Sequence, residues 1–473
     1  MFSHSTEVKR DYTGTVYGVE MGTAAYDKAA EFINARMTGN GARILHWWQD
    51  DYWLWKHPAY TQVSRTELRR LLMSWLQTTT SGEVDSRFRD EVFEHVDAML
   101  FTQSPRGMPV WLPIPRNEQE HRHEWLLFQN GILDVTRLIE GEGMTEVPLE
   151  PTTPRWFART WFPVPWEPAA TCPLWVRVLD QWMCGDEAMV AFLQEFVGYC
   201  LTTDMRHGIG LFLEGEGANG KTTFADVVTA LVGQHNCSSV PLQDWSLPFS
   251  LADTYGKLIN FSPETDARRE IPAALLKGYI TGDLYTFKRK YKEGVTARPT
   301  AKLIITWNRR PRVNDDSDGF WRRIRLVPWR AVFDVQRRDE YLLDKLKEEL
   351  PGIMRWAVEG LVRLRRVGKF TLPSQVLNAA DSYREESDTA RAFCGLALKE
   401  APGSCVPKLL VFRAYTDWCE DRGYLPVKLP GFLKALYRRF PTVRSGRRRI
   451  DGDRETVLEN LMLTQEGRAL IPL

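Results

Sequence analysis

The sequence predicts an α/β protein built around a phosphate-binding loop, and three observations lead to that fold class. An apolar run at 209–213 is followed by a glycine-rich loop and then by a helix-like segment at 223–232. Two later apolar runs, 257–262 and 302–307, lead into polar residues, as buried strands of such a core do. Stretches with helical periodicity precede and follow these runs, so helices are expected to flank the core.

The composition is that of an ordinary globular protein. The 473 residues are 43% apolar and 26% charged, with a formal net charge of +1, so any surface for nucleic acid must be local. Seven single cysteines without a Cys-x-x-Cys pair predict reduced thiols rather than a zinc or disulfide framework. The chain has no signal-peptide pattern and no apolar span of about 18 residues, so we expect a cytoplasmic protein with no membrane partner.

Changes in composition divide the chain into regions. The region rich in tryptophan carries Asp50 and Asp51, which we interpret as surface acids, and an Asn130-Gly131 pair that predicts a β-hairpin turn. Seven prolines between 147 and 173 preclude a helix and indicate a stiff connector, and a polar break at 370–390 indicates a second boundary. The expected regions are a polar arm, an α+β accessory domain, the connector, the ATPase domain and a C-terminal domain (1–35, 36–146, 147–173, 174–368 and 389–473).

The glycine-rich loop has the spacing of a nucleotide site. Glycines let backbone N–H groups turn toward phosphates, and the helix that follows adds positive potential. Lys221 is expected to reach the β- and γ-phosphates of ATP, and the Thr222 hydroxyl to bind Mg²⁺. The predicted binding segment is Gly215, Glu216, Gly217, Ala218, Asn219, Gly220, Lys221, Thr222 and Thr223.

Hydrolysis of ATP also needs an acid and a group that senses the γ-phosphate. Glu264 follows the apolar run at 257–262 and is the candidate for activating water and holding the metal, with Asp266 as second choice. Asn308 follows the run at 302–307 and is the candidate sensor. The alternatives are an ordinary loop acid and a turn-forming asparagine.

Two groups of cations lie near these positions. Arg322 and Arg323 follow Phe320-Trp321 and suit a trans-acting arginine finger, and which of the two would serve is open. Surface ion pairing is the alternative. Four further cations interleave with aromatic residues just before the sensor strand, a pattern that favours DNA contact over a solvated face: Lys288, Arg289, Lys290 and Lys292.

The C-terminal region is locally basic. Between 422 and 450 it has nine cations and no acid, and its pattern predicts helices near 389–399, 407–421 and 430–440, followed by strands at 442–453 and 454–463. That order is the outline of a winged helix. Docking of a partner protein, or of other copies of this chain in a ring-shaped assembly, is the alternative use of this surface. The candidate DNA-binding residues are Arg438, Arg439, Arg447, Arg448 and Arg449.

Together these motifs resemble superfamily 3 DNA helicases, specifically the helicase half of phage and plasmid primase-helicases of the poxvirus type. The resemblance covers roughly 170–365. The sequence motifs that carry it are Cys172-Pro-Leu-Trp175, Glu195-Phe-Val-Gly-Tyr199, the phosphate loop, Leu276–Asp283, Trp307-Asn308, Gly319-Phe-Trp-Arg-Arg323 and Glu349-Leu-Pro-Gly-Ile353.

The resemblance implies an AAA+-type core with a helical collar, a ring that is usually a hexamer, and a pre-sensor hairpin lining its pore. On this basis Lys288, Arg289, Lys290 and Lys292 fall on or beside that hairpin, and the C-terminal domain is similar to the winged helix appended to many relatives. The region upstream is short for the primase domain of many relatives, so a separate primase or replisome protein is the expected partner.

The predicted function is an ATP-dependent replicative DNA helicase of a phage or other mobile element, acting in the bacterial host cytoplasm. It would translocate on single-stranded DNA and unwind forked duplex. The alternative is a non-unwinding AAA+ ATPase that binds DNA as an origin-binding loader or switch. A small-molecule kinase fits less well, because the chain is long and has a basic hairpin where a compact acceptor pocket is expected.

Overall fold

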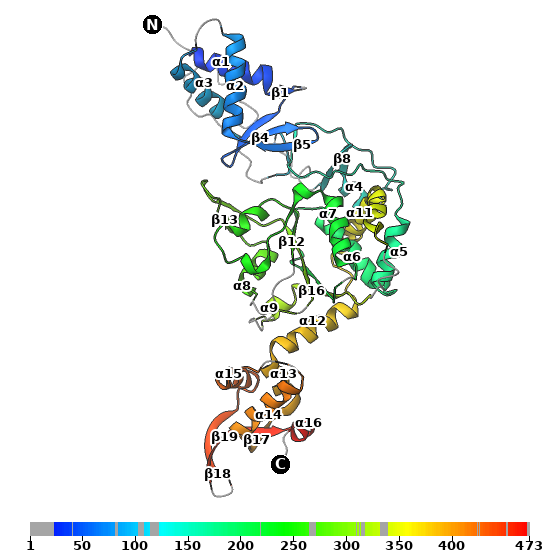
Figure 1. Cartoon of the computed structure of the whole chain (residues 1–473), viewed down its shortest axis with the longest axis vertical. Helices are drawn as coiled ribbons and strands as arrows, with labels where there is room; N and C mark the ends of the chain where they lie inside the picture. Colours follow the sequence, from blue (N-terminus) through cyan, green and yellow to red (C-terminus); the bar gives the residue numbers. More distant parts are fainter. Residues whose placement is uncertain are drawn as a thin grey trace.

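The protein is elongated, and three regions follow one another along its long axis (Figure 1). A region rich in tryptophan lies at the N-terminal end, a region centred on a parallel sheet lies in the middle, and a small α+β region lies at the C-terminal end. The computed structural model describes residues 23–39, 41–80, 84–102, 108–113, 123–217, 219–263, 271–308, 310–311, 313, 317–331, 339–422, 424, 426–450 and 453–470.

The N-terminal region packs three helices against a three-stranded antiparallel sheet. The strands pair in the order β3-β4-β5, and the shared core includes Phe32, Leu72 and Val96. The elements are α1 (Ala24–Arg36), β1 (Thr38–Gly39), β2 (Ala42–Arg43), β3 (Leu45–Trp48), β4 (Asp51–Lys56), β5 (Ala59–Val63), α2 (Arg65–Thr79) and α3 (Ser86–Leu100).

Helix α1 differs from the polar arm expected over 1–35. Its buried residues Ala25, Ala29, Phe32 and Ile33 lie on one face, and Thr23 caps its N-terminus by accepting from the Tyr26 N–H. The polar side chains that suggested an arm occupy the other face. Residues 1–22 of that arm lie outside the described residues.

Residues 108–113 and 123–166 connect the N-terminal and middle regions without a long helix. The predicted hairpin is present, with its turn one residue earlier than expected: Phe128 of β7 pairs with Gly131 of β8, so Gln129 and Asn130 form the turn. Phe128, Leu133 and Trp166 share the hydrophobic core of the middle region. The elements between the two regions are β6 (Val110–Trp111), β7 (Trp125–Phe128), β8 (Gly131–Asp134), α4 (Val135–Glu140) and β9 (Trp156–Phe157).

The middle region is organised around a five-stranded sheet in which every pairing is parallel. The strand order is β11-β12-β15-β10-β16, so β10, which leads into the phosphate loop, lies between β15 and β16, the last two strands of the sequence order. The strands are β10 (Gly210–Glu214), β11 (Cys237–Ser238), β12 (Ile259–Ser262), β15 (Lys302–Trp307) and β16 (Ile324–Pro328). A separate two-stranded hairpin, β13 (Tyr285–Phe287) with β14 (Val295–Ala297), precedes β15.

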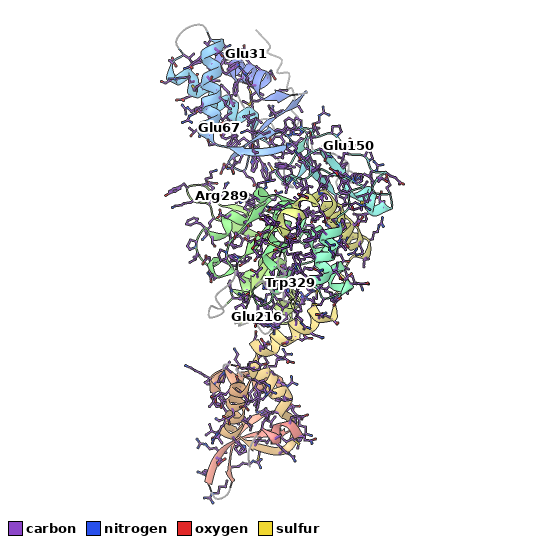
Figure 2. The ribbon with its side chains drawn as sticks, turned by 45° about the vertical axis from the view of Figure 1, so that its right-hand side comes forward. Glu31, Glu67, Glu150, Glu216, Arg289 and Trp329 are labelled. Carbon is purple, nitrogen blue, oxygen red and sulfur yellow. The ribbon has the colours of Figure 1, made fainter. Side chains whose placement is uncertain are left out.

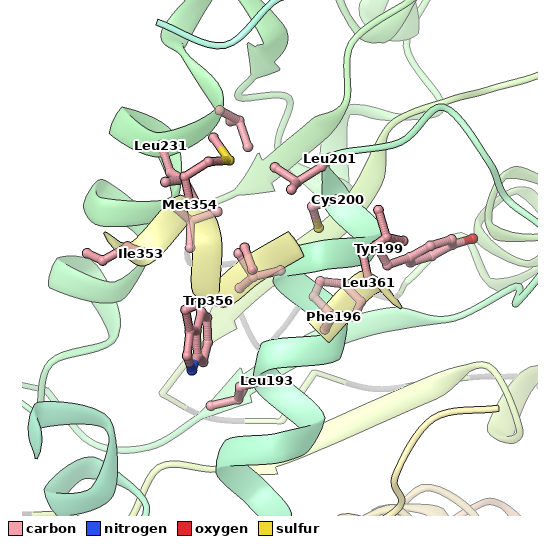
Figure 3. Packing of buried hydrophobic residues seen from close by; sticks show 14 of the residues in the cluster. Leu193, Phe196, Tyr199, Cys200, Leu201, Leu231, Ile353, Met354, Trp356 and Leu361 are labelled. Atoms are coloured by element: carbon pink, nitrogen blue, oxygen red, sulfur yellow. The ribbon is translucent and has the colours of Figure 1, made fainter. Parts of the chain in front are cut away.

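Helices cover this sheet and supply the largest core cluster (Figure 3). Helices α6 and α11 cross so closely that a Cβ on Gly198 would lie 2.3 Å from the Ala357 carbonyl oxygen, and one on Gly360 would lie 2.3 Å from the Gln194 carbonyl oxygen. The helices of the middle region are α5 (Pro173–Trp182), α6 (Glu187–Cys200), α7 (Lys221–Val232), α8 (Ala273–Ile280), α9 (Asp318–Trp321), α10 (Leu342–Glu348) and α11 (Leu350–Val367), with 3-10 turns η1 (Gln234–Asn236), η2 (Leu242–Asp244) and η3 (Ser250–Thr254).

Two of the sequence motifs that carry the family resemblance meet in space. The Glu349 carboxylate accepts hydrogen bonds from the N–H groups of Leu174 and Trp175 at the start of α5, at 3.0 and 2.9 Å. A Cβ on Gly352 would lie 2.1 Å from the Thr171 carbonyl oxygen. These motif residues therefore hold α5 against α11, which places α5 beside the nucleotide loop.

The C-terminal region is reached through α12 (Ser374–Ser387), which spans the gap between the two regions in Figure 1. The polar break expected at 370–390 is thus largely helical, because Val376, Ala379 and Tyr383 give α12 an apolar face. The elements that follow are α13 (Thr389–Ala397), β17 (Leu398–Pro407), α14 (Lys408–Asp421), α15 (Leu429–Arg439), β18 (Arg444–Ile450), β19 (Asp453–Leu463) and α16 (Gln465–Ala469).

The three helices and the final strand pair expected in this region are present. The sequence did not indicate β17, which begins one residue after α13 ends and pairs with β19, giving the antiparallel order β17-β19-β18. The helix was predicted to extend to 399, but Leu398 already pairs with Leu463 as a strand residue.

Candidate nucleotide site and nucleic-acid interface

The glycine-rich loop connects the end of β10 to the start of α7, and the loop itself supplies oxygens to its lysine. The Lys221 Nζ donates to the Gly215 and Glu216 carbonyl oxygens at 2.5 and 3.2 Å and to Asn219 Oδ1 at 3.1 Å. All three acceptors lie within six residues of Lys221, whose side chain is buried. The loop therefore folds around its own ammonium group, as a phosphate cradle does.

Two tryptophans hold the loop in shape. Trp329 Nε1 donates to the Asn219 carbonyl oxygen at 2.7 Å, and Asn219 Nδ2 donates to the Trp329 carbonyl oxygen at 3.0 Å. Gly220 has φ of +96°, and a Cβ there would lie 2.5 Å from the Trp182 indole. Only glycine fits this position, because the backbone is left-handed and the indole occupies the space of a side chain.

The loop opens into a cleft of about 880 Å³. Lys221, Thr222 and Thr223 line it from the loop side, and Asn308 lines it from the end of β15. Because β10 and β15 are adjacent parallel strands, their C-terminal ends bring the loop and the candidate sensor to one edge of the sheet. The other lining residues include Leu174, Arg177, Val178, Gln181, Trp182, Ser262, Pro263, Asp339, Glu340, Leu342 and Leu343.

Three predicted positions fall outside the described residues: Ala218, Glu264 and Asp266. Pro263, the residue before Glu264, is described and lines the cleft at the end of β12. Among the described residues, no group of three or more His, Cys, Asp or Glu side chains is placed to hold a metal ion. A cation here would depend on the Thr222 hydroxyl, the acid after Pro263 and the oxygens of a bound phosphate.

A cluster of charges behind the loop was not indicated by the sequence. Arg310 donates to both carboxylate oxygens of Glu214, at 2.5 and 2.8 Å, and to Glu386 Oε1 on α12 at 2.6 Å. Glu214 immediately precedes the loop, and Arg310 lies two residues after Asn308. The cluster therefore joins the loop strand, the sensor strand and the helix that leads to the C-terminal region. The sequence Asn308-Arg-Arg-Pro311 was the feature that could have indicated this cluster. The partners of Arg310, Glu214 and Glu386, lie 96 and 76 residues away, so the sequence alone did not identify them.

The two candidate finger arginines differ from each other. Arg323 is half-buried and donates to the Gly319 carbonyl oxygen, and burial together with the Arg322 charge lowers its pKa. Arg322 is exposed. Neither lines the described cleft of its own chain. Of the pair, Arg322 has the side chain that can extend from the surface.

The four cations before β15 lie on or beside the β13–β14 hairpin, and they fall into two classes. Lys288 and Lys290 are exposed, and the Lys290 Nζ lies 5.3 Å from the ring centre of Tyr291, which is 93% exposed. Arg289 and Lys292 instead pair with Asp51 of β4, each at 2.6 Å. Asp51 was interpreted from the sequence as a surface acid, which is wrong: it is 7% exposed, because the hairpin covers it. Asp50 is exposed, as expected.

The candidate arginines of the C-terminal region lie on α15 and β18. Arg447, Arg448 and Arg449 are exposed, and Arg448 pairs with Glu459 at 3.2 Å across the β18–β19 hairpin. Arg438 and Arg439 are also exposed and end α15. Arg439 leans back onto α13, where a Cβ on Gly395 would lie 3.2 Å from its guanidinium.

No helix in the described ranges is both long and apolar enough to cross a membrane.

The hairpin and the nucleotide loop lie toward opposite ends of the middle region, with Arg289 next to the N-terminal region and Glu216 near α12 (Figure 2).

Comparison with known proteins gives matches to parts of the chain. A family of unknown function (DUF5906) matches residues 213–323, which include the loop, the hairpin and Asn308. Two viral proteins whose names call them putative helicases are also similar. L207/L206 of Acanthamoeba polyphaga mimivirus is 27% identical over 179 residues, and 022R of Frog virus 3 (isolate Goorha) is 25% identical over 243 residues.

These sequence matches are partial on both sides. They cover 36% and 44% of this chain, but only 18% and 24% of the two viral proteins. The overall fold is similar to two apo structures of the NrS-1 C-terminal region, each with a TM-score of 0.51 and 11% identity, covering 87% of this chain and 94% of that one. The chain is therefore similar to viral proteins named as helicases and shares a mixed α/β fold with this solved region.

Proposed function

We propose that this chain is the motor part of an ATP-dependent DNA helicase of the superfamily 3 type, with an AAA+-type core. The observation that carries the proposal is the shared edge of β10 and β15. The lysine of a phosphate loop and the amide of Asn308 line one cleft there, and a basic hairpin directly precedes the Asn308 strand. The similarity to viral proteins named as helicases supports it.

The residues of the cleft have distinct roles in this proposal. The β- and γ-phosphates of ATP replace the three loop oxygens that hold the Lys221 ammonium, so the cation is already in place when the nucleotide enters. Thr222 and Glu264 would hold Mg²⁺, which neutralises charge that develops on the phosphates. Glu264 orients the attacking water, Asn308 contacts the γ-phosphate, and exposed Arg322 reaches the site of the neighbouring subunit.

The remaining cations would bind DNA. Lys288 and Lys290 project from the β13–β14 hairpin toward a single strand in the pore of a ring, usually a hexamer in this superfamily. We infer a winged-helix role for 389–473, with β18–β19 as a basic wing that contacts duplex phosphates at a fork. The chain would act in replication of a phage or other mobile element.

The test compares the wild-type chain with Lys221→Ala in two assays, steady-state phosphate release and strand separation on forks with 3′ or 5′ tails. Loss of the ammonium should lower hydrolysis by about 100-fold or more and abolish separation, because it stabilises charge on the transferred phosphoryl group. Lys369→Ala, an exposed lysine outside the cleft, is the matched control and should leave both rates unchanged.

Each outcome has a distinct meaning. Unchanged hydrolysis in Lys221→Ala would remove the nucleotide site from the proposal. Hydrolysis that DNA stimulates, without separation of any fork, would favour the non-unwinding ATPase that loads or switches at an origin. A chain that stays monomeric with a nucleotide analogue and DNA would exclude the ring and the role of Arg322.

A further inference from the structure

The turn between β3 and β4 brings a carboxylate from the N-terminal region to the basic hairpin. Gln49 and Asp50 form a two-residue turn with φ of 52° and 61°, the left-handed pair that suits a tight antiparallel hairpin. Asp51 is the first residue of β4 and lies opposite Trp48. The turn geometry therefore fixes where the Asp51 side chain starts.

The Asp51 carboxylate is fully engaged. Its Oδ2 accepts from Arg289 Nη1 at 2.6 Å, and its Oδ1 accepts from Lys292 Nζ and from Gln62 Nε2, both at 2.6 Å. Arg289 also donates to the Gln49 carbonyl oxygen at 3.4 Å. One buried anion therefore holds two cations of the hairpin, and the ion cluster keeps a net positive charge.

Aromatic contacts extend this interface behind the ion cluster. The Arg159 guanidinium lies 5.8 Å from the Trp53 ring of β4 and 4.6 Å from the Tyr255 ring. A Cβ on Gly256 would overlap that guanidinium, so the glycine makes room for it. Tyr255 donates to the Gln49 side chain, and the centre of its ring lies 5.2 Å from that of Phe287 at the base of the hairpin. The interface is thus built from several elements and is not a single surface ion pair.

We propose that the β3–β4 turn is an internal competitor of nucleic acid, with the Asp51 carboxylate occupying on Arg289 and Lys292 the position that a phosphate of single-stranded DNA takes when the hairpin is engaged. This inference rests on the proposed function. A carboxylate and a phosphodiester both present anionic oxygens to a guanidinium and an ammonium, so one can replace the other.

The division of the four cations fits this competition. Lys288 and Lys290 are exposed and can make the first contact with a strand. Arg289, whose side chain is 14% exposed, and Lys292, which is 45% exposed, both stay paired with Asp51 until the turn withdraws. DNA must displace a carboxylate that is already desolvated, so the turn weakens the binding of DNA to the hairpin. The N-terminal region then determines when the hairpin binds with all four charges.

The test measures binding of a labelled oligodeoxythymidine to the full chain as a function of salt, with basal ATP hydrolysis measured without DNA. Asp51→Asn keeps the side-chain shape but removes the charge. It should tighten binding about 5- to 10-fold and steepen the slope of log affinity against log salt by about 1 to 2, because two more phosphate contacts become available. Basal hydrolysis should not change. Asp50→Asn, at the exposed neighbouring residue, should behave as wild type.

A second variant, Arg289→Gln, distinguishes competition by Asp51 from a loss of folding in the Asp51→Asn variant. Arg289→Gln should weaken binding less than about 2-fold in the wild-type background but about 5-fold in the Asp51→Asn background, since the cation is available only there. Weaker or unchanged binding by Asp51→Asn, with wild type binding DNA normally, overturns this inference alone. Failure of wild type to bind DNA or hydrolyse ATP overturns the proposed function as well.

Discussion

The cation of the nucleotide loop and the cations of the β13–β14 hairpin are held in opposite ways. Lys221 is bound by three oxygens of its own loop, all within six residues of it. Arg289 and Lys292 share a carboxylate that lies 238 and 241 residues away. The first arrangement is a property of a short segment, and the second exists only when two regions of the chain are assembled.

This difference separates two kinds of site. A cation held by oxygens of its own loop can be positioned when that loop closes. Cations whose partner is distant in sequence respond to movement of the region that carries that partner. Such movement can free them to bind a ligand or keep them paired. Arg310 is of the second kind although it lies in the nucleotide region, because Glu214 and Glu386 reach it from β10 and α12.

The largest predicted effect is on DNA binding, from the exposed arginines of β18. Replacing Arg447, Arg448 and Arg449 with glutamine should weaken binding to forked DNA about 100-fold at low salt and reduce the salt slope by about 2 to 3, since each phosphate contact releases a counterion. Fluorescence anisotropy at several salt concentrations measures both. Lys399→Gln on β17 is the control in the same region. An unchanged salt slope would assign this surface to a protein partner or to the ring.

A smaller effect is expected from the long-range cation of the nucleotide region. Arg310→Ala leaves the Glu214 and Glu386 carboxylates close together and half-buried without their shared partner. It should lower the free energy of unfolding by about 2 kcal/mol, or roughly thirtyfold in the unfolding equilibrium. Urea unfolding followed by tryptophan fluorescence measures the change.

Glu386→Gln is the matched control for Arg310→Ala, because it removes only the charge of Glu386 and leaves the contacts of Arg310 with Glu214 and with Ser382 of α12. Its cost should be about 0.5 kcal/mol, typical of one partly exposed ion pair. Equal losses in the two variants would show that the α12 contact, rather than the loop-strand contact, carries the stability of the cluster.

The smallest effect is expected from the two exposed lysines of the hairpin. Lys288→Ala with Lys290→Ala should lower unwinding about 10-fold while ATP hydrolysis without DNA stays unchanged, because these side chains grip the strand and do not face the cleft. The ratio of strands separated to phosphate released measures the coupling. Equal unwinding by the double variant would remove the hairpin from the DNA path.

Local patterns of sequence predicted much of the fold. The hairpin near Asn130, the strand before the phosphate loop and the three C-terminal helices were all expected, because each depends on spacing and turn chemistry within a few residues. Helix α12 and strand β17 were missed. Tyr383 finds its apolar partners only against Trp307 and Trp321, and β17 exists only because β19 pairs with it.

The sequence by itself identified the nucleotide loop, since glycine, lysine and threonine at fixed spacing are what a phosphate cradle requires, although Trp182 and Trp329 pack against it from other parts of the chain. Tertiary structure alone decided that Asp51 is buried against Arg289, that Arg310 joins three elements, and that Arg322 rather than Arg323 extends from the surface. The physical reason is the range of the interaction. Turns and caps are satisfied by neighbours in sequence, whereas the partner of a buried charge is whichever opposite charge the packing brings within reach.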